Sequence, residues 1–337
     1  MKNIFPFSLI VLFALLFTSC EHQKEVVVYC TVDQVFSEPI LKDFEKETGI
    51  KVKAVYDTEE TKSTGVLNRL IAEKNNPQCD VFWSGDPLRN NILKEKGITA
   101  SYQSKATARI PAYFRDVDNQ WTGFSARARV LIFNRKLISA DSLPRGIMDF
   151  VLPKYKGQFA IANPLFGTTT FHIAAIFGAL GDSAAKEWMN KMKANGLVIA
   201  TSNGDVKKRV MKGEIAFGLT DTDDAFEAKK ESEDVDYIFL NQQEDGLGSL
   251  IIPNAVSLID KSPNSAEAKQ LIDYLISKQT EAKLAVSCAQ MPLIKGVKTP
   301  EDVPSLDQIK PMKVDCNHIT KKLEAIQGWL KKWIEEK

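Results

Sequence analysis

Three carboxylates in four positions, Asp221-Thr222-Asp223-Asp224, follow an apolar run at 215–219. Carboxylates crowded away from water need a compensating cation. Their oxygens suit calcium, magnesium or ferric ions, and they also accept hydrogen bonds from sugar hydroxyls or an amine. A solvated acidic turn that caps a following helix is the alternative that needs no ligand. The segment is a candidate binding site, with Asp223 and Asp224 as candidate metal ligands.

A second candidate is the stretch NPLFGTTT at 163–170, which joins an expected strand to an expected helix. Free backbone N–H groups at a helix N-terminus bind anions, so Gly167, Thr168 and Thr169 are candidate anion ligands. Capping by a threonine alone is the alternative. Asn203 adds a polar group at another strand end, although a turn that needs the following glycine explains this pair nearly as well.

Two arginines, Arg127 and Arg129, stand two positions apart in an extended run and should share one face of a strand. An arginine facing a cleft can clamp a phosphate or carboxylate with two parallel hydrogen bonds. Structural salt bridges are the comparable alternative, and only one of the two arginines needs to reach a ligand.

Catalytic patterns are weak in this sequence. It contains no Gly-x-Ser-x-Gly elbow, no Walker glycine loop and no Gly-x-Gly-x-x-Gly after the first strand. No histidine has an evident nucleophile partner, and no basic residue flanks Cys30 to lower its pKa. A binding protein rather than an enzyme is expected. An exported hydrolase or transferase that uses Cys30 or the acidic segment is the alternative, and a signalling receptor is a third class.

Strand-like and helix-like runs alternate from residue 26 onward, which predicts an α/β sheet with crossover helices. The expected strands are 26–30, 51–56, 80–84, 121–134, 159–162, 197–200, 215–219 and 248–259. The expected helices are 37–48, 65–74, 86–95, 168–180, 184–193, 206–212 and 265–277, the last capped by Ser265. A C-terminal amphipathic helix carries Leu323, Ile326, Leu330 and Trp333, which favours core packing over membrane contact.

The long strands 121–134 and 248–259 are expected to cross between two lobes, with the ligand between them. The expected lobes are 26–125 plus about 250–290, and 126–249 plus about 291–337. Ligands in open α/β sheets gather where strands end, which selects the loops 30–34, 57–63, 84–86, 163–170, 201–205 and 220–224. The candidate ligand-binding residues are Thr31, Asp33, Asp57, Ser84, Arg127, Gly167, Thr168, Thr169, Asn203, Asp221 and Thr222.

The N-terminus reads MKNIFPFSLIVLFALLFTSC, a cation, a short apolar run and small residues, which is typical of an export signal. Phe17-Thr18-Ser19-Cys20 resembles a lipobox, which predicts cleavage of 1–19, lipidation of Cys20 and a short polar tether at 20–25. A cleaved signal with an incidental cysteine is the alternative. Several acyl chains would hold the protein stably on a membrane, facing the periplasm or the cell exterior.

The composition is that of an ordinary globular protein. The 337 residues have a net charge of +1, with 44% hydrophobic and 26% charged residues, which argues against disorder and against a broad nucleic-acid surface. The length favours about two domains. Five cysteines and three histidines are too few and too scattered for a zinc ribbon.

Several stretches resemble bacterial solute-binding proteins of ABC importers, in particular the ferric-iron-binding branch of the type II periplasmic fold. They are VVVYCTVDQ, FEKETGIKVKAVYDTE, NPQCDVFWSGDP, WTGFSARARVLIFN, ANPLFGTTTFHIAA, KKRVMKGEIAFGLTDTDDA and SPNSAEAKQLIDYLIS. The resemblance implies a monomeric receptor whose lobes close on a solute and deliver it to a permease and its ATPase. It also implies a ferric ion or other hard cation, with a synergistic anion held near Thr168 and Asn203.

The iron binders of this family place two adjacent tyrosines where this chain has Asp223 and Asp224. Either the carboxylates replace the phenolates around a metal, or the site holds a phosphorylated organic molecule without metal. In this fold the first and third strands are parallel neighbours, so Cys30 and Cys79 should lie roughly 13–17 Å apart, too far for a disulfide. The sequence does not decide whether Cys288 and Cys316 form a disulfide.

Overall fold

The computed structural model of the chain describes residues 23–57 and 64–336. The expected signal segment 1–19, the expected lipidation site Cys20 and most of the 57–63 loop lie outside these residues. Within the described residues, no helix combines the length and the apolar character needed to cross a membrane.

The strands of the described residues are β1 (Glu25–Cys30), β2 (Lys51–Tyr56), β3 (Val81–Ser84), β4 (Thr99–Ala100), β5 (Thr122–Asn134), β6 (Phe159–Ala162), β7 (Val198–Ala200), β8 (Phe217–Asp221), β9 (Val235–Ile238) and β10 (Ile251–Ile259). The α-helices there are α1 (Gln34–Thr48), α2 (Thr64–Ala72), α3 (Pro87–Glu95), α4 (Gly167–Leu180), α5 (Asp182–Ala194), α6 (Asn203–Met211), α7 (Thr222–Glu231), α8 (Ser265–Leu275), α9 (Lys278–Cys288) and α10 (Cys316–Glu335).

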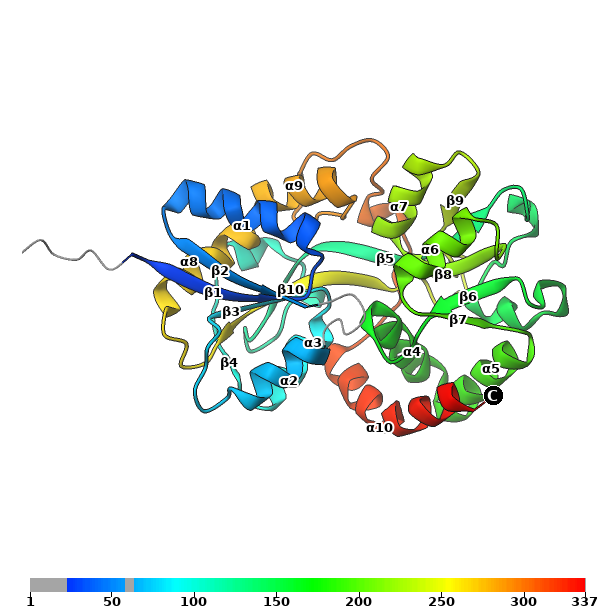
Figure 1. Cartoon of the computed structure of the whole chain (residues 1–337), viewed down its shortest axis with the longest axis horizontal. Helices are drawn as coiled ribbons and strands as arrows, with labels where there is room; N and C mark the ends of the chain where they lie inside the picture. Colours follow the sequence, from blue (N-terminus) through cyan, green and yellow to red (C-terminus); the bar gives the residue numbers. More distant parts are fainter. Residues whose placement is uncertain (1–22, 58–63, 337) are drawn as a thin grey trace, which may run out of the picture.

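The strands follow the order β2-β1-β3-β10-β5-β8-β6-β7, with β4 beside β10 and β9 beside β5. The first half of β5 pairs with β10 and its second half pairs with β8, so β5 and β10 connect two lobes (Figure 1). Lobe 1 contains β1–β4 and lobe 2 contains β6–β9. The predicted two-lobed α/β fold with two crossing strands is confirmed.

Each lobe is a sheet covered by helices on both faces. In lobe 1, α1, α8 and α9 bury apolar side chains against one face, while α2 and α3 cover the other. In α1 the buried residues Ile40, Leu41 and Phe44 follow a helical spacing, and the helix ends at Gly49, whose φ of 72° suits glycine. In lobe 2, α4 and α5 cover one face and α6 and α7 the other.

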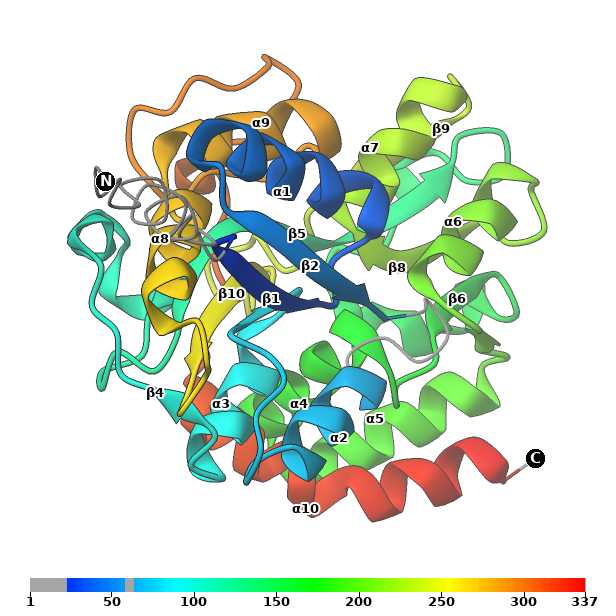
Figure 2. The same cartoon turned by 60° about the vertical axis from the view of Figure 1, so that its left-hand side comes forward.

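The C-terminal helix α10 packs against both lobes. It contacts α4 of lobe 2 and α3 of lobe 1, and the two views in Figures 1 and 2 show it running beneath them. The four apolar residues predicted to face the core, which are Leu323, Ile326, Leu330 and Trp333, are buried. The Asn91 amide of α3 donates a 3.0 Å hydrogen bond to Thr320 Oγ1 of α10.

A buried carboxylate holds the chain segments that pass between the lobes. Glu281 of α9 is fully buried and accepts 2.9 Å hydrogen bonds from the backbone N–H groups of Ser125, Leu293 and Ile294. Ala126 and Met291 also form a two-bond antiparallel bridge, so the segment after α9 runs beside β5. The two crossing strands therefore have a third partner in the hinge.

The expected elements are present, with shifted boundaries. β8 extends two residues beyond the predicted end at Leu219, and Ser265 is the first residue of α8 rather than its cap, which is Asn264. The sequence did not predict β4, β9 or α9. β1 and β3 are parallel neighbours as expected, with Cys30 opposite Trp83, and the described cysteines Cys30, Cys79, Cys288 and Cys316 are free thiols.

Candidate functional site

A cleft of about 240 Å³ opens between the two lobes beside β5 and β8. This volume is smaller than that of a typical drug-sized site and suits a small solute. Lobe 1 contributes the start of α1, and lobe 2 contributes the first turns of α4, α6 and α7. The residues that line the cleft include Thr31, Asp33, Phe36, Asp86, Arg127, Phe166, Gly167, Thr168, Thr169, Asn203, Lys207, Lys208, Asp221, Asp223, Asp224 and Glu227.

Most of the predicted site residues meet at this cleft, because the ends of the strands converge there. Asp57, Ser84 and Thr222 do not line it. The Asp57 carboxylate accepts a 3.4 Å hydrogen bond from the Val66 N–H in the first turns of α2. Ser84 is buried and donates to the Asp86 carbonyl and to Asn90, while Thr222 Oγ1 accepts the Ala128 N–H at 3.1 Å.

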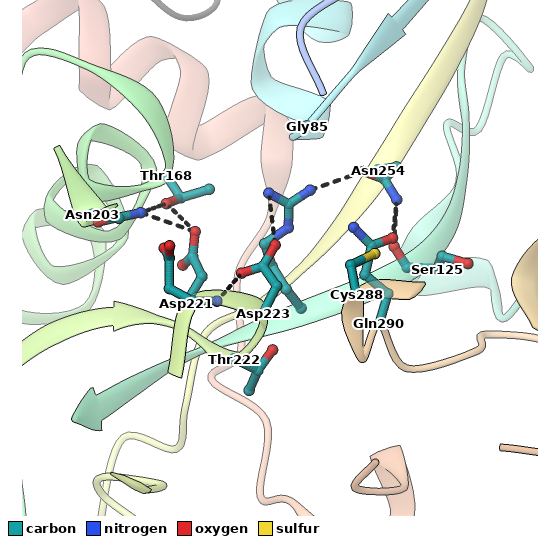
Figure 3. A network of polar contacts seen from close by, with 12 residues as sticks. Gly85, Ser125, Thr168, Asn203, Asp221, Thr222, Asp223, Asn254, Cys288 and Gln290 are labelled. Carbon is teal, nitrogen blue, oxygen red and sulfur yellow. Dashed lines mark hydrogen bonds and ion pairs between the residues drawn. The ribbon is translucent and has the colours of Figure 1, made fainter. Parts of the chain in front are cut away.

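Asp221 lies at the centre of a buried polar cluster in lobe 2 (Figure 3). Its Oδ1 accepts from Arg129 Nη1 at 2.8 Å, and its Oδ2 accepts from Thr168 Oγ1 at 2.6 Å and from Asn203 Nδ2 at 3.0 Å. Arg129 also donates to Thr168, Thr169 and Asn203, at 3.1–3.3 Å. The groups expected to hold an anion thus surround a carboxylate of the chain itself.

The two other carboxylates of this segment lie nearer the opening of the cleft, and each has a basic neighbour at a longer distance. Asp223 Oδ2 is 3.6 Å from Arg127 Nη1, and Asp224 Oδ1 is 3.9 Å from Lys207 Nζ. Neither distance is that of a hydrogen bond. Asp221 is 2% exposed and is therefore not solvated, whereas Asp223 and Asp224 are half-buried in the first turn of α7.

Arg127 joins the hinge to both lobes. Its Nη2 donates to Asn254 Oδ1 of β10 at 2.9 Å, and Asn254 in turn donates to Gln290 Oε1 at 2.6 Å. A Cβ added to Gly85 of lobe 1 would lie 3.6 Å from Arg127 Nη2, so the guanidinium rests against the backbone there. Of the two arginines, Arg127 lines the cleft and Arg129 lies behind it.

Two carboxyl groups of the cleft, those of Asp223 and Asp224, have pKa values above the ordinary value of an aspartate. Burial raises the pKa of Asp223, and the charges of Asp221 and Asp33 add to this effect against the opposing charge of Arg127. Burial and the charges of Asp223 and Asp221 raise the pKa of Asp224 to about 7, while Lys207 and a hydrogen bond from Thr220 oppose the rise. The positive charge near these two carboxyls therefore does not offset their burial and their mutual repulsion.

Stability should therefore depend on pH through Asp224. At pH values below its ordinary pKa of 3.8 this carboxyl is protonated in both folded and unfolded chains, whereas above about 7 the folded chain carries an unfavourable charge. Relative to Asp224→Asn, the wild type should lose roughly 1–3 kcal/mol of unfolding free energy as pH rises through that window. Urea denaturation of both proteins at about pH 5 and about pH 8 measures the difference. Identical pH dependence would contradict the assignment.

Several cleft residues were missed by the sequence analysis. Lys207, Lys208 and Glu227 lie one turn inside α6 or α7, beyond the strand-end loops where the sequence predicts ligand-binding residues. Lys207 could have been predicted, because it follows the candidate residue Asn203 by four positions, a spacing that places both side chains on the same face of a helix. Cys30 is buried and its pKa is raised to about 12 by burial, so it is not an activated nucleophile.

Comparison with known proteins gives the chain a family. The profile of the bacterial extracellular solute-binding proteins matches residues 40–311. Iron uptake protein A1 of Synechocystis sp. is 26% identical over 299 residues, which cover 86% of this chain and 81% of the relative. A putative 2-aminoethylphosphonate-binding periplasmic protein of Salmonella paratyphi A is also 26% identical, with coverage of 86% and 80%.

A solved structure agrees with the fold. Iron-bound HitA from Pseudomonas aeruginosa superposes with a TM-score of 0.83 at 22% identity, covering 91% of this chain and 99% of HitA. The chain belongs to the bacterial extracellular solute-binding protein family. Its fold is that of type II periplasmic binding proteins.

Proposed function

We propose that this protein is the receptor of an ABC importer and captures a small organic solute that carries an ammonium group. The solute occupies the cleft, the lobes close on it, and the closed form is presented to a permease and its ATPase. The lobes are 26–125 with about 250–290 and 126–249 with about 291–337, with α10 in contact with both. The receptor acts as a monomer and is not an enzyme.

The observation that carries this proposal is the pair of carboxylates Asp223 and Asp224. They lie in the cleft with raised pKa values, and their basic neighbours stand beyond hydrogen-bond distance. An ammonium group has three N–H donors and one positive charge, which is what this pair lacks. Asp33, on the opposite lobe, adds a further carboxylate to the same cleft.

An anionic end of the solute also has partners available. Phe166 precedes α4 without a side-chain cap, and Gly167, Thr168 and Thr169 line the cleft, so the first turn of α4 faces the cleft with no capping side chain on its N–H groups. Lys207 and Lys208 line the same part of the cleft. 2-Aminoethylphosphonate, which the name of the Salmonella relative gives as its ligand, has an ammonium group at one end and a phosphonate group at the other.

A hard cation is the second candidate, favoured by the ligand oxygens of Asp221, Asp223 and Asp224, which lie within 4.8 Å of one another. The name of the Synechocystis relative points the same way. Asp221 already has an arginine partner at 2.8 Å, however, and Arg127 stands 3.6 Å from Asp223 without a hydrogen bond to it. A trivalent ion would approach both guanidinium groups, so the ammonium solute fits the electrostatics better.

Calorimetric titration of chelator-treated protein tests the proposal with matched probes. 2-Aminoethylphosphonate is expected to bind one to one without metal, ethanolamine more weakly, and ethylphosphonate, which lacks the ammonium group, not measurably. Failure of both amines to bind, or one-to-one binding of ferric ion alone, would overturn the proposal.

We also propose that the signal segment 1–19 is removed and that lipidated Cys20 anchors the receptor through the tether 20–25, facing the periplasm or the cell exterior. Cys20→Ser should move the protein from the membrane fraction to the soluble fraction, because loss of the acyl chains removes the anchor. Cell fractionation followed by mass measurement of the N-terminal peptide checks this. An unacylated wild-type peptide would contradict it.

A further inference from the structure

The polar cluster around Asp221 has the composition of an oxyanion site. Arg129 supplies a buried positive charge, Thr168 a hydroxyl and Asn203 an amide, and all three donate to one carboxylate at 2.6–3.0 Å. Figure 3 shows the Thr168 and Asn203 side chains directed at the same oxygen of Asp221. Phosphate, sulfate and carboxylate ligands are bound in proteins by this combination of donors.

The Asp221 carboxylate lies between the cleft and the buried guanidinium of Arg129. Asp221 is the last residue of β8 and lines the cleft, while its partner Arg129 lies opposite it on β5 and is 2% exposed. Thr168 and Asn203 line the cleft themselves, but an anion that entered from the cleft would reach the Arg129 guanidinium only by taking the place of the Asp221 carboxylate. The side chain is tethered to the backbone and loses little entropy in staying there, whereas a free anion loses its translational freedom.

We propose that Asp221 is a built-in anion that closes this subsite to free oxyanions such as inorganic phosphate and sulfate, and so sets the specificity of the cleft. A free oxyanion without an ammonium group meets the like charges of Asp221 and Asp223, whereas those charges attract a solute that also carries an ammonium group. This inference rests on the proposed cleft as the binding site and not on the identity of the solute.

Removing the carboxylate should turn the subsite into an anion site. In Asp221→Ala the donors of Arg129, Thr168 and Asn203 are left around a space of carboxylate size that opens to the cleft. Inorganic phosphate is expected to fill that space because the buried guanidinium then lacks its counter-charge. Wild type is expected to show no such binding.

The test is calorimetric titration of both proteins with inorganic phosphate, with thermal unfolding as a second readout. Phosphate should bind Asp221→Ala at one site, at least about tenfold more tightly than wild type, and should raise its melting temperature. Asp236→Ala is the matched control, since it removes a carboxylate of the same lobe that pairs with Arg135 and Lys229 outside the cleft, and it should not create a phosphate site.

Two results would overturn the inference: wild type that binds phosphate as tightly as the variant, or a folded Asp221→Ala that does not bind it. If Asp221→Ala does not fold, Asp221→Ser removes the same carboxylate and replaces it in the test, with the same expected and contradicting results. Tight phosphate binding by the wild type would contradict the inference even without a folded variant. Failure of 2-aminoethylphosphonate to bind the wild type would contradict the proposed solute but would not affect this test of Asp221.

Discussion

An Arg129→Met variant is expected to unfold with a free energy about 3–5 kcal/mol below that of the wild type. The guanidinium is buried and pairs with Asp221 at 2.8 Å, while it also donates to Thr168, Thr169 and Asn203. Methionine fills much of the volume but leaves the Asp221 carboxylate buried without its cation. Urea denaturation followed by tryptophan fluorescence measures the loss.

Arg135→Met provides the control for this prediction. Arg135 lies in the same lobe and pairs with Asp236, but 51% of its side chain is exposed. Surface pairs of this kind contribute about 0–1 kcal/mol, so the control should stay close to wild type. Equal losses for the two variants would mean that the Arg129–Asp221 pair is not the buried electrostatic centre of lobe 2.

A protein with both Asp223→Asn and Asp224→Asn should bind 2-aminoethylphosphonate at least about 100-fold more weakly than wild type. The change keeps the size of both side chains and removes both negative charges from the cleft, so the ammonium group loses its counter-ions. Above about pH 7 the folded variant should be no less stable than wild type, because two buried charges with raised pKa values have been removed.

The matched control carries Asp234→Asn and Asp236→Asn. These carboxylates also lie in lobe 2, on and beside β9, where they pair with Lys136, Arg135 and Lys229 outside the cleft. Calorimetric titration of the control should reproduce wild-type affinity. Full affinity in the Asp223–Asp224 variant would remove these two carboxylates from the site.

Periodicity and strand-end rules predicted most of the fold because the lobes are built from buried apolar runs. The strand Phe159–Ala162 and the long β5 have the expected bounds within one residue. β9 was missed because Val235-Asp236-Tyr237-Ile238 is a short strand with one apolar residue fully buried. α9 was missed because its polar face is large and its buried Glu281 acts through tertiary hydrogen bonds that no local pattern reveals.

The candidate site was predicted by position but not by side-chain direction. Strand-end loops do converge on the cleft, yet Ser84 turns inward to Asn90 and Thr222 turns to the backbone of β5. The pairing of Asp221 with Arg129 could not be predicted, because it depends on β8 extending to Asp221 and on the register of β5 with β8. That register places the carboxylate where an external anion was expected.

This pairing changes the interpretation of the acidic segment. The sequence leaves the acidic segment open to a metal ion, to an amine or sugar hydroxyls, or to solvent. The structure gives Asp221 its own arginine and leaves Asp223 and Asp224 as the pair short of positive charge. A monovalent ammonium group matches that remaining need better than a ferric ion does.

Native mass spectrometry combined with metal analysis, on protein purified without chelator, tests the central claim most directly. We predict one bound organic molecule per chain that contains an amine nitrogen, with no stoichiometric metal, and loss of that molecule from the Asp223→Asn, Asp224→Asn variant. One ferric ion per chain, or a bound organophosphate without an amine, would contradict it.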